Sequence, residues 1–417
     1  MKQSVLYLSY DGMLEPLGES QVLGYLERLA GDYKICLVSF EKAHDRSDLE
    51  RMETMRKRLS QKGITWRPLP YHKSPSALAT AYDIAVGAIG ALALARRERV
   101  AIVHARSYVP ALMALAVKRL SGARFLFDMR GFWADERVDG GLWPREGLLY
   151  RTTKALERRF LLAADHVVTL THASARVIEG FEFLRAKAPP VSVIPTCADL
   201  DKFCVRSDTR GEPFVFGYVG SIGTWYLFDD TLRFFHALMD RRPDARLLVV
   251  NRHDHEAIRG AARRAGIPAE RLELVAADHS EVAAHISRMH AAAALIKPAY
   301  SKIASAPTKL AEYLGCGVPC IGNAGVGDME HILTGQGVGV TLSGFSDAAI
   351  AQGVDQLLSL LDDPAIRSRC AAVARELFAL DHGVQAYQKI YEALGGKGSS
   401  PDVSLPSTSI HTHATSR

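Results

Sequence analysis

Cysteine is scarce in this sequence, and no block of like charge interrupts it. Only 6 of the 417 residues are Cys, and their spacing, including Cys316 and Cys320, fits neither a disulfide framework nor a zinc site. This favours a reduced, cytoplasmic protein. Charged residues make up 23% of the chain and are dispersed, which excludes a wholly disordered, collagen-like or coiled-coil protein.

Two further absences restrict the function. The sequence has no basic stripe interleaved with aromatic residues, so we expect no nucleic-acid partner. It has no Asp-x-Asp pair or histidine cluster suited to a metal ion, so we expect no metal cofactor.

Long apolar runs are also rare. Ser76–Ala95 is twenty residues of mostly Ala, Leu, Ile and Val, a length that could span a bilayer. Asp83 near its middle would cost about 2.5–3.5 kcal/mol on insertion, so we expect a buried or membrane-surface helix instead. The first apolar run, Val5–Leu8, is too short for a signal-peptide core and predicts a strand.

The net charge of +5 is unevenly distributed. Residues 1–204 carry 30 Lys and Arg against 23 Asp and Glu, a net +7, whereas the remainder carries 21 against 23, a net −2. A basic first half suits an acidic partner, such as anionic lipid headgroups or a phosphorylated substrate. An ordinary solvated surface explains so small a difference equally well.

Short apolar runs alternate with helical patterns over almost the whole chain. The alternation predicts an α/β fold with doubly wound parallel sheets, and it stops at Ile194–Phe203 before it restarts, which predicts two domains. The predicted strands are Val5–Leu8, Ile35–Phe40, Ile64–Pro68, Ala101–His104, Arg124–Asp128, His166–Leu170, Val191–Ile194, Phe214–Val219, Arg246–Val250, Leu272–Val275, Ala292–Ile296, Val318–Ile321 and Gly339–Leu342. The clearest helical patterns are Gln21–Leu29, Asp48–Gln61, Ala111–Leu120 and Tyr150–Leu162.

We place the two domains at residues 1–200 and 201–380, facing each other across a cleft. In such folds ligands bind outside the carboxyl ends of the strands. Residues 395–417 are rich in Gly, Ser, Thr and Pro without periodicity, which predicts a disordered tail.

The loop after the first strand is the first candidate site. It contains Gly12 and Gly18, and Ser20 is placed to cap a helix that begins near Gln21. Backbone N–H groups of such a loop can bind a phosphate or sugar oxygen. The spacing is not G-x-G-x-x-G, and an ordinary strand-to-helix loop explains it as well or better.

The segment that follows the strand Arg124–Asp128 is the second candidate. Charges beside large aromatic residues at a strand's carboxyl end suit sugar recognition, although an ion pair that braces a loop is the structural alternative. The residues concerned are Asp128, Arg130, Trp133, Asp135 and Glu136.

The helix that opens at Pro307 is the third and strongest candidate. Its positive N-terminus lies beside Ser305, Thr308 and Lys309, with Lys297 and Lys302 upstream, and this set of groups would stabilise a diphosphate. Glu312 can pair with Lys309 or accept hydrogen bonds from ribose hydroxyls, and spacing does not separate these roles.

At these residues the sequence resembles the retaining glycosyltransferases of family 4 (glycosyl transferases group 1), which have the GT-B fold, over about residues 1–394. Pro307–Pro319 is similar to that family's donor-site helix, whose Glu binds ribose, and Asp128–Trp133 is similar to its Asp-x-Arg-Asp-Leu-Trp segment. Gly217–Gly223 stands where the family opens its second domain with a loop that contacts phosphate. A terminal helix, placed at 381–394, resembles the one that returns to the first domain.

The sequence departs from the family at two places. Many members carry a Glu eight residues before the ribose-binding Glu, where this chain has Ala304. The family's Arg and Lys pair after Gly220 is also missing, because Ser221 follows directly. We expect Lys297, Lys302 and Lys309 to supply the charge for the diphosphate instead.

The resemblance implies two Rossmann-like domains and transfer of a sugar, with retained configuration, from a nucleotide-diphosphate sugar to a glycan or lipid-linked acceptor. Surface polysaccharide or glycoconjugate synthesis in the cytoplasm, with peripheral contact to the inner face of the membrane, fits these features. The alternatives are a nucleotide-sugar 2-epimerase and a silent nucleotide-sugar-binding protein. The predicted catalytic residues are Asp128 and Arg130, the donor-binding residues Gly18, Gly220, Ser221, Lys297, Lys302, Ser305, Thr308, Lys309 and Glu312, and the acceptor-side residues His104, Arg106, Trp133, Asp135 and Glu136.

Overall fold

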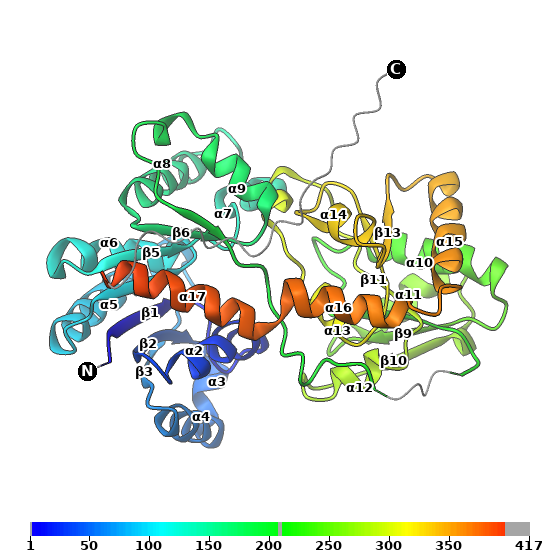
Figure 1. Cartoon of the computed structure of the whole chain (residues 1–417), viewed down its shortest axis with the longest axis horizontal. Helices are drawn as coiled ribbons and strands as arrows, with labels where there is room; N and C mark the ends of the chain where they lie inside the picture. The colour runs from blue at the N-terminus through cyan, green and yellow to red at the C-terminus, as the bar shows by residue number, and fades with distance from the viewer. Residues whose placement is uncertain (1, 207–210, 397–417) are drawn as a thin grey trace.

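The chain forms two α/β halves that lie side by side in the computed structural model shown in Figure 1. The structure describes residues 2–206 and 211–396, apart from the side chain of Ser76. Of the predicted tail, only Gly395 and Gly396 fall within the described residues, and positions 397–417 lie outside them.

The first half is built on a seven-stranded parallel sheet in the order β3-β2-β1-β4-β5-β6-β7. The strands are near-continuous apolar runs because helices cover both faces of the sheet. Two clusters of buried apolar side chains, one on each face, form the core. The strands are β1 (Ser4–Ser9), β2 (Lys34–Glu41), β3 (Thr65–Pro70), β4 (Ile102–Arg106), β5 (Arg124–Asp128), β6 (His166–Thr169) and β7 (Val191–Val193).

The second half repeats this arrangement with six parallel strands in the order β10-β9-β8-β11-β12-β13. All the predicted strands are confirmed, four of them with the same bounds. Strand β11 ends before Ile296, since the backbone N–H of that residue donates to Asn323 Oδ1 (2.8 Å). The strands are β8 (Val215–Val219), β9 (Arg246–Val250), β10 (Leu272–Val275), β11 (Ala291–Ala293), β12 (Cys320–Asn323) and β13 (Gly339–Leu342).

Helices connect the strands of both sheets. Those of the first half are α1 (Pro16–Gly18), α2 (Gly24–Leu29), α3 (Ala43–Ser47), α4 (Leu49–Gln61), α5 (Ser76–Arg97), α6 (Tyr108–Ser121), α7 (Trp133–Asp139), α8 (Leu148–Ala163) and α9 (His172–Glu179). Those that follow are α10 (Phe228–Arg241), α11 (His255–Arg264), α12 (Val282–Ile286), α13 (Thr308–Gly315), α14 (Met329–Leu333), α15 (Asp347–Leu361), α16 (Ile366–Phe378) and α17 (Leu380–Leu394). A π-helical segment, η1 (Glu19–Leu23), joins α1 to α2, and single 3₁₀ turns are η2 (Glu182–Leu184), η3 (Ala269–Arg271) and η4 (Tyr300–Ala304).

Two helix predictions were wrong. The helix after β1 begins at Pro16 rather than near Gln21, because proline's fixed φ suits the first helical position. Ser20 therefore caps nothing, and its hydroxyl donates to the Pro16 carbonyl within the helix (2.8 Å). The structural alternative for the segment after β5 treated it as a loop and expected no helix there, but from Trp133 onward it forms α7.

Helix α17 belongs to the second half by sequence and to the first half by packing. In Figure 1 the pair α16 and α17 crosses from one half to the other. Leu380, Tyr387 and Ile390 lie in the same apolar cluster as Val5 and Leu26 of the first half. The last helix thereby ties the two sheets together.

Helix α5 packs against α6 on one side and leaves its other side exposed. Asp83, in its apolar run, is 1% exposed and accepts hydrogen bonds from Tyr10 Oη (2.9 Å) and the backbone N–H of His72 (3.0 Å). Within the described residues, Ala77–Arg97 is the single helical stretch long and apolar enough to cross a membrane, and 33% of its most apolar window is buried.

Candidate active site

A cleft of about 1290 Å³ lies between the two halves. Its lining includes Asp11, which follows β1, Arg106, which ends β4, and Ile296, which follows β11. Strand order reverses between β1 and β4 and again between β8 and β11, and α/β sheets bind ligands at such reversals. The volume exceeds the roughly 300–1,000 Å³ typical of one small ligand, so the cleft has room for two substrates.

His104 on β4 and Asp128 at the end of β5 lie beneath the first-half wall, each 1% exposed. Asp128 Oδ2 accepts a hydrogen bond from Tyr387 Oη (3.1 Å) and lies 3.6 Å from His104 Nε2. His104 Nδ1 lies 2.7 Å from Tyr391 Oη. Both tyrosines come from α17, so the terminal helix holds the predicted reaction-centre residues, and neither His104 nor Asp128 lines the cleft.

The charges around Asp128 fix its ionisation. Burial alone would raise the pKa of Asp128, but the Arg130 guanidinium, His104 and Arg106 outweigh it and hold that pKa below its usual value. Burial lowers the pKa of His104, so its ring is neutral at pH 7. Asp128 is consequently a fixed negative charge, which suits a positioning role better than that of a general base.

Two arginines line the first-half wall directly. Arg106 is 5% exposed, its Nε donates to Asp11 Oδ2 (3.2 Å), and its Nη1 has no hydrogen-bond partner among the described residues. Arg130 Nη1 lies 3.8 Å from Asp128 Oδ1, and the residue has a left-handed backbone with a φ of 59°. An unpartnered buried guanidinium N–H carries a desolvation cost that an anionic ligand would offset.

The start of α7 contributes both structural and cleft residues. Trp133 and Glu136 line the cleft. Asp135 does not, because it is buried and accepts from Lys154 Nζ (2.9 Å) and Tyr150 Oη (2.8 Å). Of Trp133, Asp135 and Glu136, only Asp135 therefore has a structural position inside the first half instead of one on the cleft wall.

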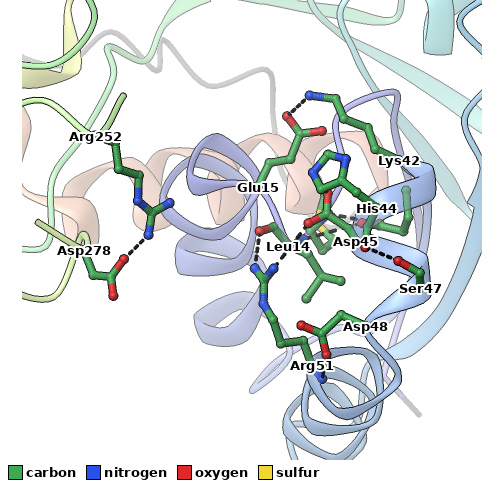
Figure 2. A network of polar contacts seen from close by, with 12 residues as sticks. Leu14, Glu15, Lys42, His44, Asp45, Ser47, Asp48, Arg51, Arg252 and Asp278 are labelled. Atoms are coloured by element: carbon green, nitrogen blue, oxygen red, sulfur yellow. Dashed lines mark hydrogen bonds and ion pairs between the residues drawn. The ribbon is translucent and has the colours of Figure 1, made fainter. Parts of the chain in front are cut away.

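Side-chain contacts hold the loop between β1 and α1 in place. Figure 2 shows Lys42 paired with Glu15 (2.8 Å) and Arg51 donating to the Leu14 carbonyl (3.0 Å). A Cβ added at Gly18 would collide with the Gly12 carbonyl. Gly18 therefore serves the close packing of α1 on this loop, and it is not among the cleft-lining residues.

The N-terminus of α13 forms part of the opposite wall. Ser305 and Thr308 line the cleft, and Pro307 occupies the N-cap position. The Lys302 ammonium also lines it, but that group pairs with Glu136 Oε1 (2.9 Å) and lies 3.7 Å from the Trp225 ring centroid. Lys302 thus links the two halves and has only part of its charge available to a ligand.

Lys309 lies one layer behind this wall. Its ammonium is 4.3 Å from the Tyr218 ring centroid and 3.9 Å from that of Tyr226, and it has no hydrogen-bond partner among the described residues. Burial lowers the pKa of Lys309 to about 7. Gly220 has a φ of 107°, and a Cβ there would stand 3.4 Å from the ammonium, so the lysine borders the loop after β8.

Glu312 is one turn further along the same helix and is also buried. Burial raises the pKa of Glu312 to about 7, although Lys309 and Lys202 lower it. Its Oε1 lies 3.8 Å from His279 Nε2. No hydrogen bond or ion pair joins Glu312 to Lys309 in the described structure. The pairing of Glu312 with Lys309, which was one of the two roles that the spacing left open, is therefore not seen.

Two predicted donor residues have exposed side chains. Lys297 and Ser221 lie on the surface, and neither lines the cleft. Sequence reasoning missed the partners that give the site its electrostatics, which are Tyr218, Tyr226, His279, Tyr387 and Tyr391. A tyrosine in a strand or on an apolar helix face has the pattern of an ordinary core residue, so no local signal marks these positions.

Sequence comparison assigns each half separately. Residues 20–197 match a family described as a glycosyl transferase 4-like domain, and residues 202–376 match glycosyl transferases group 1. No curated protein matches the chain in sequence.

Solved structures share the whole architecture at low sequence identity. A glycosyltransferase from Rickettsia africae is similar with a TM-score of 0.70 at 14% identity, over 95% of this chain and 100% of its own. HepE from Anabaena, solved with UDP, gives a TM-score of 0.66 at 13% identity, over 94% and 100%. A putative UDP-N-acetylglucosamine 2-epimerase from Listeria monocytogenes gives 0.61 at 14% identity, over 96% and 99%. These likenesses establish the two-domain GT-B fold.

We predict that Lys309→Met stabilises the ligand-free protein. Replacing a buried charge by an apolar side chain of similar volume is often worth about 1–4 kcal/mol. Because burial lowers the pKa of Lys309 from its ordinary 10.5 to about 7, the penalty is fully present below pH 7 and disappears as the pH rises towards 10.5. Urea unfolding at pH 6.5 and pH 9.5 measures the gain, which should shrink at the higher pH. Lys297→Met, at an exposed position, is the control and should change nothing.

We predict that Tyr387→Phe lowers turnover while donor binding stays intact. The variant removes the hydroxyl that donates to Asp128, at a cost of about 1 kcal/mol in stability. Because Asp128 and Arg130 would then be misplaced, kcat should fall about tenfold while the KM for the donor stays unchanged. Release of nucleoside diphosphate measures both constants. The control is Tyr25→Phe, which loses the hydrogen bond that the Cys197 backbone N–H donates to Tyr25 Oη. It should lose about as much stability as Tyr387→Phe but keep the wild-type kcat. Equal kcat losses in both variants would refute a positioning role for Tyr387.

Proposed function

Because the chain belongs to the group 1 glycosyltransferase family of GT-B fold, we propose that it transfers a sugar from a nucleoside-diphosphate sugar with retention of anomeric configuration, as family 4 enzymes do. The observation that carries this proposal is the buried Lys309 ammonium at the N-terminus of α13, which has aromatic neighbours and no hydrogen-bond partner among the described residues. The UDP complex of the Anabaena relative supports a nucleotide-sugar donor.

In the proposed complex the diphosphate lies against the first turn of α13. Thr308 already lines the cleft, and free backbone N–H groups of a helix's first turn bind phosphate oxygens. Tyr226 lines the cleft and its ring centroid lies 3.9 Å from the Lys309 ammonium, so we expect the ring to move aside for the lysine to reach the phosphate. Glu312, on the same helix face as Thr308, accepts hydrogen bonds from the ribose hydroxyls.

The chemistry then follows from the charges. The bond from the anomeric carbon to the diphosphate oxygen breaks, the sugar gains oxocarbenium character, and negative charge builds on the leaving group. Lys309 and the α13 N-terminus stabilise that charge in the transition state. The acceptor hydroxyl attacks from the leaving-group face, which retains the configuration, and its proton passes to a donor phosphate oxygen.

The first-half wall positions the reacting sugar and the acceptor. Arg130 contacts the ligand, while Asp128 fixes Arg130 from behind through the 3.8 Å ion pair. Since lysine and helix-terminal charge are available for the leaving group, we propose that turnover needs no metal ion, and EDTA should leave it unchanged. The acceptor is a glycan or a lipid-linked sugar used in surface polysaccharide or glycoconjugate synthesis, in the cytoplasm at the inner face of the membrane.

Thermal shift with UDP, GDP, ADP and their sugar conjugates tests the donor site. A ligand at about 100 times its dissociation constant adds roughly 2.7 kcal/mol, so one nucleotide class should shift the transition clearly. Glu312→Ala should abolish the shift, and Glu330→Ala, an exposed glutamate on α14, should leave it intact. No shift with any nucleotide would sink the donor-site assignment.

Product analysis tests the reaction itself. Incubation of the shifting sugar nucleotide with acceptor extracts should give a glycoside whose anomeric configuration, read by NMR, equals that of the donor. An epimerised nucleotide sugar formed without any acceptor would instead identify a 2-epimerase, and donor binding with no turnover would identify a silent binding protein.

We predict that nucleoside-diphosphate binding at pH 8 takes up close to one proton. Lys309, with a pKa of about 7, is mostly neutral in the free protein at that pH, and a bound diphosphate raises its pKa again. Calorimetric titration with UDP in HEPES and in Tris, whose ionisation enthalpies differ, measures the uptake. Lys309→Met should abolish it, while proton uptake that persists in this variant would place the titrating group elsewhere.

A further inference from the structure

Part of the first-half wall of the cleft is apolar. Its lining draws on α5, α6 and α8 and on the segment that joins α7 to α8. Representative residues are Ala81 and Ile84 of α5, Leu112 of α6, and Trp143 and Leu149 near the start of α8. Such a wall fits a long hydrocarbon group better than a second sugar, whose hydroxyls would need hydrogen-bond partners.

This apolar wall continues onto the outer surface. Leu142 and Leu149 line the cleft and are also 64% and 52% exposed. On α5, every exposed side chain from Ala77 to Ala93 is apolar or aromatic, and Leu78 and Ile89 are 72% and 71% exposed. Ten of the twelve exposed large hydrophobic residues in the described structure belong to the first half. Contiguous exposed apolar surface of this kind marks a binding face.

Positive charge predominates among the exposed charged residues of this part of the chain. Figure 1 places α5 and α6 at the edge of the first half that is farthest from the second half. Between residues 71 and 163, the single acidic residue with an exposed side chain is Glu146. The exposed basic residues in that range number ten: Lys73, Arg96, Arg97, Arg99, Arg119, Arg124, Arg145, Arg151, Arg158 and Arg159. Exposed apolar residues together with many exposed arginines in the same part of the chain complement an anionic lipid surface.

The inner end of the wall offers the opposite chemistry. Arg106 and Arg130 both line the cleft there. Arg106 is 5% exposed, and its Nη1 has no hydrogen-bond partner among the described residues. Guanidinium groups bind phosphate through paired N–H donors. The cleft therefore joins an inner end with two guanidinium groups, which are paired with Asp11 and Asp128, to an apolar stretch of its wall.

We propose that the acceptor is a phosphate-bearing lipid, whose phosphate binds Arg106 and Arg130 and whose hydrocarbon chain runs along the apolar wall to a bilayer docked on the outer face of α5, α6 and α8. This rests on the proposed function, since it names the acceptor class of the same cleft. A bilayer with anionic headgroups accounts for both the exposed apolar residues and the exposed arginines. A second copy of the chain would bring the same exposed arginines against one another.

Dodecyl phosphate, used below its micellar concentration, is the probe for the acceptor site. Tryptophan fluorescence is the signal, because Trp133 and Trp143 line the cleft. We expect saturable binding at least tenfold tighter than that of dodecanol or inorganic phosphate. Leu149→Glu should weaken it at least tenfold. The control is Leu49→Glu, at a position on α4 outside this face that is 78% exposed against 52% for Leu149, and it should bind as the wild type does.

Vesicle flotation tests the outer face. Phosphatidylglycerol vesicles should carry the wild type and Leu49→Glu, whereas Ile89→Glu should stay in solution, and phosphatidylcholine vesicles should carry less of either. The nucleotide-induced thermal shift should be retained in all these variants. If the wild type shows no such shift, the donor-site assignment fails, and that failure is distinct from a failure of the acceptor proposal.

Three results would overturn the proposal. Equal binding of inorganic phosphate and dodecyl phosphate would indicate a soluble phosphorylated acceptor. Equal flotation of Ile89→Glu and Leu49→Glu would show that the face does not dock on lipid. A change from dimer to monomer on Ile89→Glu substitution, seen by sedimentation, would assign the face to contact between copies of the chain.

Discussion

The ammonium of Lys309 is buried beside two tyrosine rings with no hydrogen-bond partner among the described residues, and the chemistry that we propose for the second half depends on this arrangement. A desolvated cation attracts a diphosphate far more strongly than a solvated one, because little water has to be displaced when the ligand arrives. The free protein bears the desolvation cost, which appears as a pKa lowered to about 7. In our proposal this single group takes the role of the Arg and Lys pair that the resemblance leads us to expect after Gly220, and it does so from a helix rather than from the loop.

The first half is organised by a different constraint. Asp128 and His104 are buried in central strands, where an unsatisfied polar group is costly, and α17 gives each of them one hydrogen bond to a tyrosine hydroxyl. The same helix ties the two halves together. The position of the second half and the geometry around Arg130 are thus coupled through one element, so a change in the angle between the halves would be transmitted to the cleft wall.

The architecture could be predicted from sequence, whereas the contacts that tune the site could not. Strands such as Arg124–Asp128 and Arg246–Val250 were predicted with their observed bounds, because a strand buried on both faces is a continuous apolar run. The helix at Pro307 was predicted from proline and spacing. The contact of Tyr387 with Asp128 joins residues far apart in the chain, and the pairing of Lys302 with Glu136 crosses between the halves, so no local pattern encodes either. Lys297 and Lys302 looked equivalent in sequence, and only the fold separates an exposed lysine from one that is paired.

The most direct test of this account is the structure of the protein with a bound nucleoside diphosphate. We expect the diphosphate at the backbone N–H of Thr308 and Lys309, with the Lys309 ammonium within about 3 Å of a phosphate oxygen, Tyr226 displaced, and the ribose on Glu312. A diphosphate bound at Lys297 or Lys302, with Lys309 still between its two tyrosines, would contradict it.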